Sequence, residues 1–312
     1  MTKKIFLVTL LLVLGGWSGC QIHQEFIRKG CFPLSSDITK SPITTVSPTS
    51  LKFIAVGDVG TGNKDQKQVA ETIYHICHKK GCDLILMLGD NFYPDGVASP
   101  EDPLFTTVFE NMYTRIDKPF FAVVGNHDLH QSGLSQIMYS LKNPRWNMPN
   151  FSYYFEAGPA RFFAVNTECN LWGLHELEVM LDGVSSPSPW SFVFTHRPIY
   201  SSGTHGDTDP VMRWYWQQFL QDKIDFYLAG HDHELEHLQK PGKATEYIVS
   251  GAGGQHYRSP KDRERTTSSE IPSLFIFQNT GFAWFDVKRE KVHMQFIDGE
   301  GHVLYEFSKR KN

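Results

Sequence analysis

Residues 51–58 read LKFIAVGD, a short apolar run that ends abruptly in a glycine and a carboxylate. The same design recurs along the chain, each time with strand length and with enough apolar residues for burial on both faces. The further runs are CDLILMLGD, KPFFAVVGNHD, ARFFAVNTE, WSFVFTH, IDFYLAGHDH and TEYIVSGAGG. Apolar residues at helical spacing lie between several of them, at 66–79, 174–181 and 211–220. The sequence therefore predicts an α/β protein with mixed sheets, and its tail from residue 281 predicts antiparallel strands joined by turns.

Polar side chains stand directly behind these apolar runs. In open α/β sheets, sites form beyond the carboxyl ends of the strands. Seven oxygen- or nitrogen-bearing side chains occupy such positions: Asp58, Asp90, Asn126, His127, His196, His231 and His233. We therefore expect these side chains to gather at one rim of the fold.

Five short motifs follow one another in a fixed order: GDVG at 57–60, GDNFY at 89–93, GNHD at 125–128, THRP at 195–198 and GHDH at 230–233. Each motif alone is a weak signal, because Gly and Asp both favour turns. Together they resemble the calcineurin-like metallophosphoesterase family, and within it the purple acid phosphatases of the tartrate-resistant type. The resemblance runs from residue 51 to the tail. It implies two mixed β-sheets packed together and flanked by helices, in four layers.

The resemblance also implies a binuclear metal centre in which Asp90 bridges the two ions. One ion would be held by Asp58, Tyr93 and His233, and the other by Asn126, His196 and His231. Carboxylate, phenolate, amide oxygen and imidazole together form a hard-to-borderline ligand set, which suits transition metals. Two ions about 3.5–4 Å apart can stabilise both the attacking and the leaving oxygen of an in-line displacement.

The first two motifs together indicate iron at one of the two metal positions. Many relatives have Asp-x-His there, and that histidine binds the first metal, whereas the third position here is Gly60. Tyr93 offers a replacement, although it could also be a buried aromatic residue after a turn. A phenolate is a hard anion suited to Fe(III), so we expect Fe(III) paired with a divalent Fe, Zn or Mn. Asp58, Asp90 and a Tyr93 phenolate supply three negative charges against five positive ones, which leaves a centre that attracts phosphate.

Three further residues are candidate catalytic residues. His127 resembles the family's proton-handling histidine, which contacts the phosphate and helps the leaving alkoxide depart. Asp128 could hold the other ring nitrogen of His127, or it could be a turn or helix cap. His205 follows His196 at the spacing seen in mammalian-type purple acid phosphatases, where that histidine assists substrate binding, but it could equally be plain surface. A required imidazolium predicts activity at mildly acidic pH.

The reaction that the resemblance implies is hydrolysis of phosphate monoesters by a metal-bridged hydroxide, which is an acid phosphatase activity. A phosphodiesterase or nucleotidase on the same scaffold is the alternative enzyme, because substrate choice depends on loops. A non-catalytic surface lipoprotein that keeps the fold for binding is a second alternative. Since every expected ligand position is filled, the enzyme is the better interpretation.

The amino terminus predicts export. Lys3 and Lys4 precede an apolar run at 5–14, which fits a secretory signal and is too short to cross a bilayer. Ser18-Gly19-Cys20 resembles a bacterial lipoprotein cleavage box and implies a lipid on Cys20 that holds the protein on a membrane. Trp17 departs from the usual leucine of that box, and an ordinary signal peptide followed by a soluble secreted or periplasmic protein is the alternative.

We therefore expect a signal peptide at 1–19, a lipid-anchored tether rich in Ser, Thr and Pro at 20–50, and a metallophosphoesterase domain at 51–312. Without residues 1–19 the chain has 28 basic and 34 acidic side chains, a formal charge of −6. No basic patch is evident, so we expect no nucleic-acid binding. The cysteines at 31, 77, 82 and 169 allow three pairings, and spacing alone does not choose among them.

Overall fold

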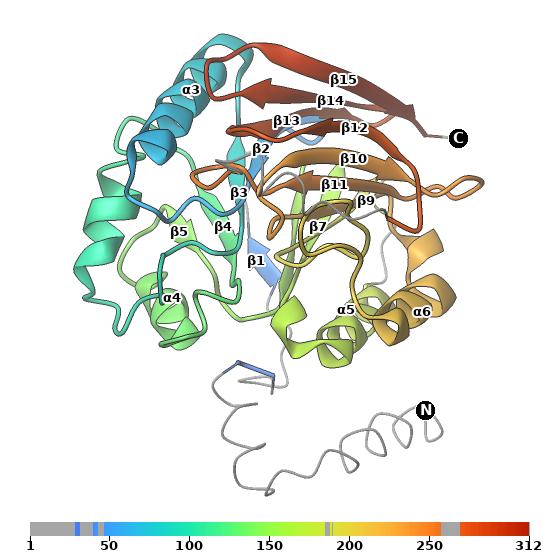
Figure 1. The fold of residues 1–312 in the computed structure, drawn as a ribbon, viewed down its shortest axis with the longest axis horizontal. Helices are drawn as coiled ribbons and strands as arrows, with labels where there is room; N and C mark the ends of the chain where they lie inside the picture. The colour runs from blue at the N-terminus through green and yellow to red at the C-terminus, as the bar shows by residue number, and fades with distance from the viewer. Residues whose placement is uncertain are drawn as a thin grey trace, which may run out of the picture.

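Two mixed β-sheets form the centre of the fold, and helices lie outside them (Figure 1). The computed structural model describes residues 29–31, 40–42, 47–184, 188, 190–256 and 269–311. The predicted signal peptide and Cys20 lie outside the described residues. The expected architecture of packed mixed sheets with flanking helices is confirmed.

The seven-stranded sheet has the order β15-β14-β13-β2-β3-β4-β5. Its strands from β2 to β5 run parallel, and the tail adds three antiparallel strands beside β2, as the sequence predicted. The bounds are β2 (Ser50–Val56), β3 (Leu84–Leu88), β4 (Phe120–Val123), β5 (Trp146–Asn147), β13 (Gly281–Lys288), β14 (Lys291–Asp298) and β15 (Val303–Arg310).

The eight-stranded sheet has the order β1-β6-β7-β8-β9-β11-β10-β12. Its central strands β7, β8, β9 and β11 are parallel neighbours, and antiparallel pairs lie toward its edges. The bounds are β1 (Lys40–Pro42), β6 (Tyr153–Ala157), β7 (Ala160–Val165), β8 (Trp190–Thr195), β9 (Phe226–Ala229), β10 (Leu235–Gln239), β11 (Glu246–Ser250) and β12 (Ser273–Phe277).

The three helices expected from apolar spacing are present as α3 (Lys64–Lys80), α5 (Leu171–Gly183) and α6 (Pro210–Phe219). Capping explains the start of α3, because the side chain of Asn63 accepts from the N–H of Gln66 at 2.9 Å. The sequence did not predict α4 (Gly133–Tyr139) or the π-helical turn η1 (Phe105–Glu110). Two short 3₁₀ turns complete the described elements, η2 (Thr167–Cys169) and η3 (Gln221–Lys223).

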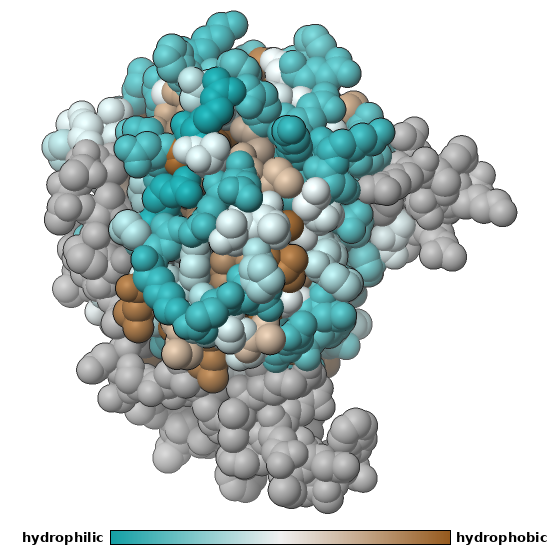
Figure 2. Space-filling model, turned by 90° about the vertical axis from the view of Figure 1, so that its left-hand side faces the viewer, coloured by the Kyte–Doolittle hydropathy of each residue, from teal (hydrophilic) through white to brown (hydrophobic). Residues whose placement is uncertain are grey.

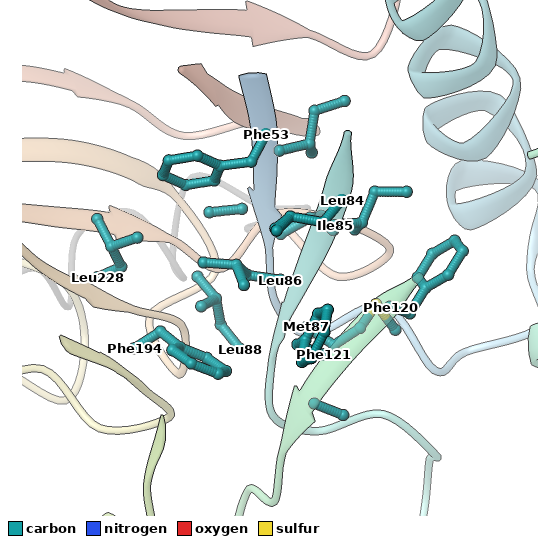
Figure 3. Close-up of a cluster of buried hydrophobic side chains, with 14 of the residues drawn as sticks. Phe53, Leu84, Ile85, Leu86, Met87, Leu88, Phe120, Phe121, Phe194 and Leu228 are labelled. Carbon is teal, nitrogen blue, oxygen red and sulfur yellow. The ribbon is translucent and has the colours of Figure 1, made fainter. Parts of the chain in front are cut away.

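Aromatic side chains fill the space between the sheets. Phe53 of β2 stacks on Phe285 at 4.5 Å and meets Phe162 and Phe192 of the other sheet edge-on at 5.1 and 5.3 Å. Figure 3 shows strand β3 among these buried side chains, with Leu88 beside Phe194. A second buried cluster packs α5 and α6 against the outer face of the eight-stranded sheet. Because strands β2, β3, β8 and β9 are buried in this way, the loops at their carboxyl ends start from fixed positions.

The chain contacts the domain earlier than the predicted boundary at residue 51. Cys31 forms a disulfide with Cys169, and Lys40–Pro42 pairs in parallel with β6. Both contacts lie in the segment that the sequence assigned to a tether, so at least these parts of it are held on the domain. The second disulfide joins Cys77 to Cys82 at the end of α3. Composition could not reveal the contacts of Cys31 and of Lys40–Pro42, because their partners lie more than 100 residues away along the chain.

The described surface on the side of α3 and α4 is mostly hydrophilic, with small hydrophobic spots (Figure 2). Large exposed apolar side chains on that part of the chain include Leu134 and Met138 of α4 and Leu141 just after it. Within the described part of the chain, no helix combines the length and the apolar character needed to cross a membrane.

Candidate metal centre

Six of the seven predicted ligands lie within a few residues of the ends of strands in both sheets, and the seventh, Tyr93, lies farther along the loop after β3. Asp58, Asp90 and Asn126 follow β2, β3 and β4 of the seven-stranded sheet. His196 follows β8, and the segment 231–233 follows β9, both in the eight-stranded sheet. The carboxyl ends of two packed sheets therefore supply one site together, as the position of the motifs predicted.

One group of donor atoms surrounds the phenol of Tyr93. Its hydroxyl lies 3.0 Å from Asp58 Oδ1 and 2.9 Å from Asp90 Oδ2. His233 Nε2 lies 3.5 Å from the same Asp58 oxygen. These are the residues that the resemblance assigned to the first ion.

A second group of donor atoms surrounds His196 Nε2. This nitrogen lies 3.1 Å from Asn126 Oδ1, 3.1 Å from His231 Nδ1 and 3.4 Å from Asp90 Oδ1. Asp90 therefore turns one carboxylate oxygen toward each group. This is the arrangement expected of a bridging ligand.

The donor set fits two cations better than none. Asp58 is fully buried and Asp90 is 2% exposed, yet among the described residues their ion-pair partners are histidines alone. Buried carboxylates without a compensating cation are costly. The ligand atoms of Asp58, Asp90 and His196 also lie within 4.8 Å of one another. Burial and the charges of Asp58 and Asp90 raise the pKa of Tyr93 far above its usual range.

The local backbone shows that these positions are specialised. Four described residues other than glycine have a positive φ, and three of them are predicted ligands: Asp58 at 58°, Asp90 at 51° and His231 at 71°. Such conformations cost on the order of 1–3 kcal/mol each and persist where the surroundings enforce them. Asp58 N–H donates to Gly89 O, and His231 N–H donates to Asp58 Oδ2, which links the three turns to one another.

Gly60 shows why Tyr93 can reach the site. The N–H of Tyr93 donates to Gly60 O at 2.8 Å, so the two loops touch through their backbones. A Cβ at position 60 would lie 2.1 Å from Asn91 O and 2.4 Å from Phe92 N. A histidine at this position would displace the loop that carries Tyr93, so the two alternative ligands exclude each other in this backbone.

We predict that Gly60→Ala lowers the free energy of unfolding by about 2 kcal/mol, because the new methyl group meets backbone atoms that cannot rotate away. Urea unfolding of the two proteins measures the difference. Gly183→Ala is the matched control, since a Cβ there would meet no described atom within 4 Å beyond its own helix backbone and chain neighbours, and it should change stability by less than about 0.5 kcal/mol. Equal stability of Gly60→Ala and wild type would contradict the close approach.

His127 lies at the edge of the site with its side chain 34% exposed. Its ring packs on that of Tyr93 at 4.6 Å, its N–H donates to Asp90 Oδ1, and its Nε2 lies 4.0 Å from Asp90 Oδ2. Its Nδ1 lies 2.5 Å from Pro94 O, so a backbone carbonyl holds this nitrogen. Asp128, the partner considered for this nitrogen, does not hold it.

Asp128 has a different task from the one first considered. Its buried carboxylate accepts the backbone N–H groups of Asn91, Phe92 and Gly125 at 2.8 to 3.1 Å. It thereby ties the GDNFY loop to the GNHD loop, in line with the alternative of a turn cap. Burial and the charge of Asp90 raise the pKa of Asp128 to about 7.

His205 lies close to the second donor group. Its ring centroid is 4.0 Å from that of His231, and its Nδ1 lies 2.9 Å from Asp232 Oδ1. Burial opposes ionisation of Asp232, but hydrogen bonds from His205 and Ser201 outweigh it and lower the pKa of this carboxyl. No motif pointed to Asp232 as the partner.

Sequence reasoning also missed three groups that orient the ligands. Leu88 O lies 2.9 Å from His196 Nδ1 and leaves Nε2 for a metal. Arg197 Nη1 lies 2.9 Å from His231 Nε2, and Glu168 holds that guanidinium at 2.7 and 3.0 Å. Glu168 stands after a strand-like run in ARFFAVNTE, which is the only signal that could have found it.

Glu234 is a buried carboxylate beside the site, and its Oε1 makes no hydrogen bond to any described residue. Burial, followed by the charges of Glu236 and Asp232, raises the pKa of Glu234 to about 9 from an ordinary value of 4.5. The folded state thus binds this proton more tightly than the unfolded state, so Glu234 makes stability fall as pH rises from 4.5 to 9.

Glu234→Gln should therefore stabilise the protein at pH 8 by about 1–3 kcal/mol and leave it nearly unchanged at pH 4.5. Urea unfolding at both pH values measures this. Glu300→Gln, which changes a carboxylate that is 70% exposed, is the control and should have little effect at either pH. A Glu234→Gln protein that is less stable than wild type at pH 8 would refute the protonated state.

Comparison with known proteins agrees with this geometry. A family model described as calcineurin-like phosphoesterase matches residues 51–235. Purple acid phosphatase 3 of Arabidopsis thaliana is 30% identical over 83% of this chain and 78% of its own length. Tartrate-resistant acid phosphatase type 5 of Sus scrofa is 26% identical over 84% of this chain and 88% of its own length. The solved structure "GAP50 the anchor in the inner membrane complex of Plasmodium" has a TM-score of 0.72 at 22% identity, over 85% of this chain and 90% of that one, and shows a shared fold alone. The chain belongs to the calcineurin-like phosphoesterase family and is a hydrolase similar to the purple acid phosphatases.

Proposed function

We propose that this protein hydrolyses phosphate monoesters, as an acid phosphatase, at a binuclear centre of Fe(III) and a divalent Fe, Zn or Mn. One observation carries the proposal: the two oxygens of Asp90 face two separate groups of donor atoms, each completed by the residues that the motifs supplied. When bound, the two metals would supply Lewis-acid activation of water and of the phosphoryl oxygens.

The protein residues divide the work by their position. Asp58, Tyr93 and His233 would hold Fe(III), because a phenolate favours that ion. The divalent ion would lie among Asn126, His196 and His231, and Asp90 would belong to both.

His127 and His205 would contact the phosphate ester. Pro94 O holds Nδ1 of His127, and Asp232 holds Nδ1 of His205, so each ring keeps Nε2 for the substrate. A protonated histidine can give its proton to the leaving alkoxide, which favours mildly acidic pH.

The test is metal analysis together with kinetics on an aryl phosphate monoester and an aryl phosphate diester. We expect iron and a second metal in nearly equal amounts, a visible absorption band, and the higher kcat/KM on the monoester. A higher kcat/KM on the diester would favour the phosphodiesterase or nucleotidase. A protein that holds two metals and hydrolyses neither ester would favour the non-catalytic alternative.

We also propose that the chain is exported and that a lipid on Cys20 anchors it to a membrane, with a soluble secreted form as the alternative. The two disulfides support export, because such bonds persist in oxidising compartments. Mass spectrometry of the mature amino terminus tests both parts. A protein that still carries residues 1–19 would contradict export, and an unmodified Cys20 would contradict the anchor.

A further inference from the structure

His205 lies at the mouth of the metal centre, over the ring of His231. The two ring planes differ by 31°, and their centroids are 4.0 Å apart. The side chain of His205 is 48% exposed, so a ligand can reach it. His205 lies in the loop after β8, whereas His231 follows β9. A contact between these two segments is therefore needed to hold the two rings in this arrangement.

One buried carboxylate fixes this ring. Asp232 has no exposed surface, and its Oδ1 accepts the backbone N–H of His205 at 2.9 Å. The same oxygen lies 2.9 Å from Nδ1 of the ring. An ionised carboxylate only accepts hydrogen bonds, so Nδ1 has to carry a proton. Nε2 is then the nitrogen that meets a substrate.

The loop that carries His205 rests on the same stretch of chain. Ser201 Oγ donates to Asp232 Oδ2 at 2.6 Å, and the N–H of Ser202 donates to Glu236 Oε2 at 3.1 Å. Gly203 approaches so closely that a Cβ there would lie 2.3 Å from Asp232 Cγ. Asp232 therefore contacts this loop at Ser201 and Gly203 as well as at His205, and only its contacts with His205 involve an imidazole ring.

Asp232 also stands between two predicted metal ligands, His231 and His233. We propose that Asp232 is a positioning residue that fixes His205 as its Nδ1–H tautomer, with Nε2 toward the phosphate ester, and so couples His205 to the metal-binding segment 231–233. The expected effect of Asp232 on kcat rests on the proposed function, whereas the tautomer of His205 that Asp232 fixes does not. Partners that orient metal-ligating histidines are typically worth 10–100-fold in metal affinity or activity, and we expect an effect at the lower end of that range for the partner of a substrate-contacting histidine.

Nitrogen-15 spectra of histidine-labelled, zinc-loaded protein test the geometry. His205 is assigned by the signals that His205→Ala removes. We expect the Nδ1–H tautomer in wild type and a mixture of tautomers in Asp232→Asn. An Nε2–H tautomer in wild type, or an unchanged His205 in Asp232→Asn, would overturn the proposal.

Asp207 offers the matched control. It accepts the N–H of Ser201 at 3.0 Å and so anchors the same loop, but it has no hydrogen bond to His205. Asp207→Asn should leave the tautomer of His205 as in wild type. If it shifted the tautomer as far as Asp232→Asn does, the loop and not the carboxylate would set it, and the proposal would fail.

Kinetics separate action through His205 from action through the metals. Asp232→Asn should lower kcat about tenfold while the metal content stays at the wild-type value. In a His205→Ala background it should cause no further loss, because the two residues act as one unit. Equal losses in both backgrounds, or loss of metal, would overturn the proposal. If wild type hydrolysed no phosphate ester, the proposed function would fall, while the spectra would still decide the positioning role.

Discussion

Asp90→Ala should lower kcat/KM for an aryl phosphate monoester by at least about 1,000-fold, which corresponds to several kcal/mol of transition-state stabilisation. Among the described residues, Asp90 alone has a side chain that faces both donor groups, at 2.9 Å from the Tyr93 hydroxyl and 3.4 Å from His196 Nε2. Its loss removes a ligand from both ions and a buried negative charge from between them. Both metals should therefore be held more weakly, and metal analysis after dialysis should find less than half of the wild-type content.

The control for Asp90→Ala is Asp222→Ala. Asp222 is an exposed carboxylate in η3 that pairs with Lys243 at 2.9 Å, so its removal should leave metal content and kcat/KM within about twofold of wild type. The bridging role would be refuted if Asp90→Ala kept two metals per chain and more than a tenth of the wild-type rate.

Tyr93→Phe should remove the visible absorption of the iron-loaded protein. The band would arise from a phenolate bound to Fe(III), and Tyr93 is the only described tyrosine with its hydroxyl beside both Asp58 and Asp90. Phenylalanine preserves the ring that packs on His127 at 4.6 Å, so the fold should be retained. We expect Fe(III) to be lost at least about tenfold faster on dialysis against a chelator, because one anionic ligand is gone.

Tyr154→Phe is the matched control for this change. Tyr154 lies in β6, where its ring packs near Phe163 at 6.2 Å, and the variant should keep the colour of wild type. An unchanged absorption band in Tyr93→Phe would exclude the phenolate. A colourless wild type that contains only zinc and is fully active would refute iron but would leave the phosphoesterase in place.

The sequence was most informative where burial and chain order decide the structure. The apolar runs predicted β2, β3, β8 and β9 because strands in the middle of packed sheets need apolar residues on both faces. The polar residues behind them had to meet, since the carboxyl ends of these strands share one rim. The motifs then identified the family, which the comparisons confirm.

The sequence was less informative where one residue can have several partners. Asp128 could have held His127, but three backbone N–H groups reach its carboxylate and a carbonyl reaches the ring. Asp232 lies within the GHDH motif, yet its link to His205 depends on how the loop 200–206 folds back. No local pattern predicts such contacts, because they arise between segments whose separation is set by the whole fold.

The π-helical turn η1 was missed for a local reason. η1 reads FTTVFE, and its two β-branched threonines favour strands over helices. The pairing of Cys31 with Cys169 joins residues 138 positions apart, and no spacing rule could select it.

That same disulfide has a consequence for the order of maturation. The disulfide closes residues 31–169 into a covalent ring. This ring contains Asp58, Asp90, Tyr93 and Asn126, whereas His196, His231 and His233 lie beyond Cys169. In an exported chain, the ring can form as soon as Cys169 reaches the oxidising side, before the last three ligands have arrived. If the chain is exported unfolded, a full set of ligands exists only after translocation is nearly finished, and the ions would then be taken up outside the cytoplasm.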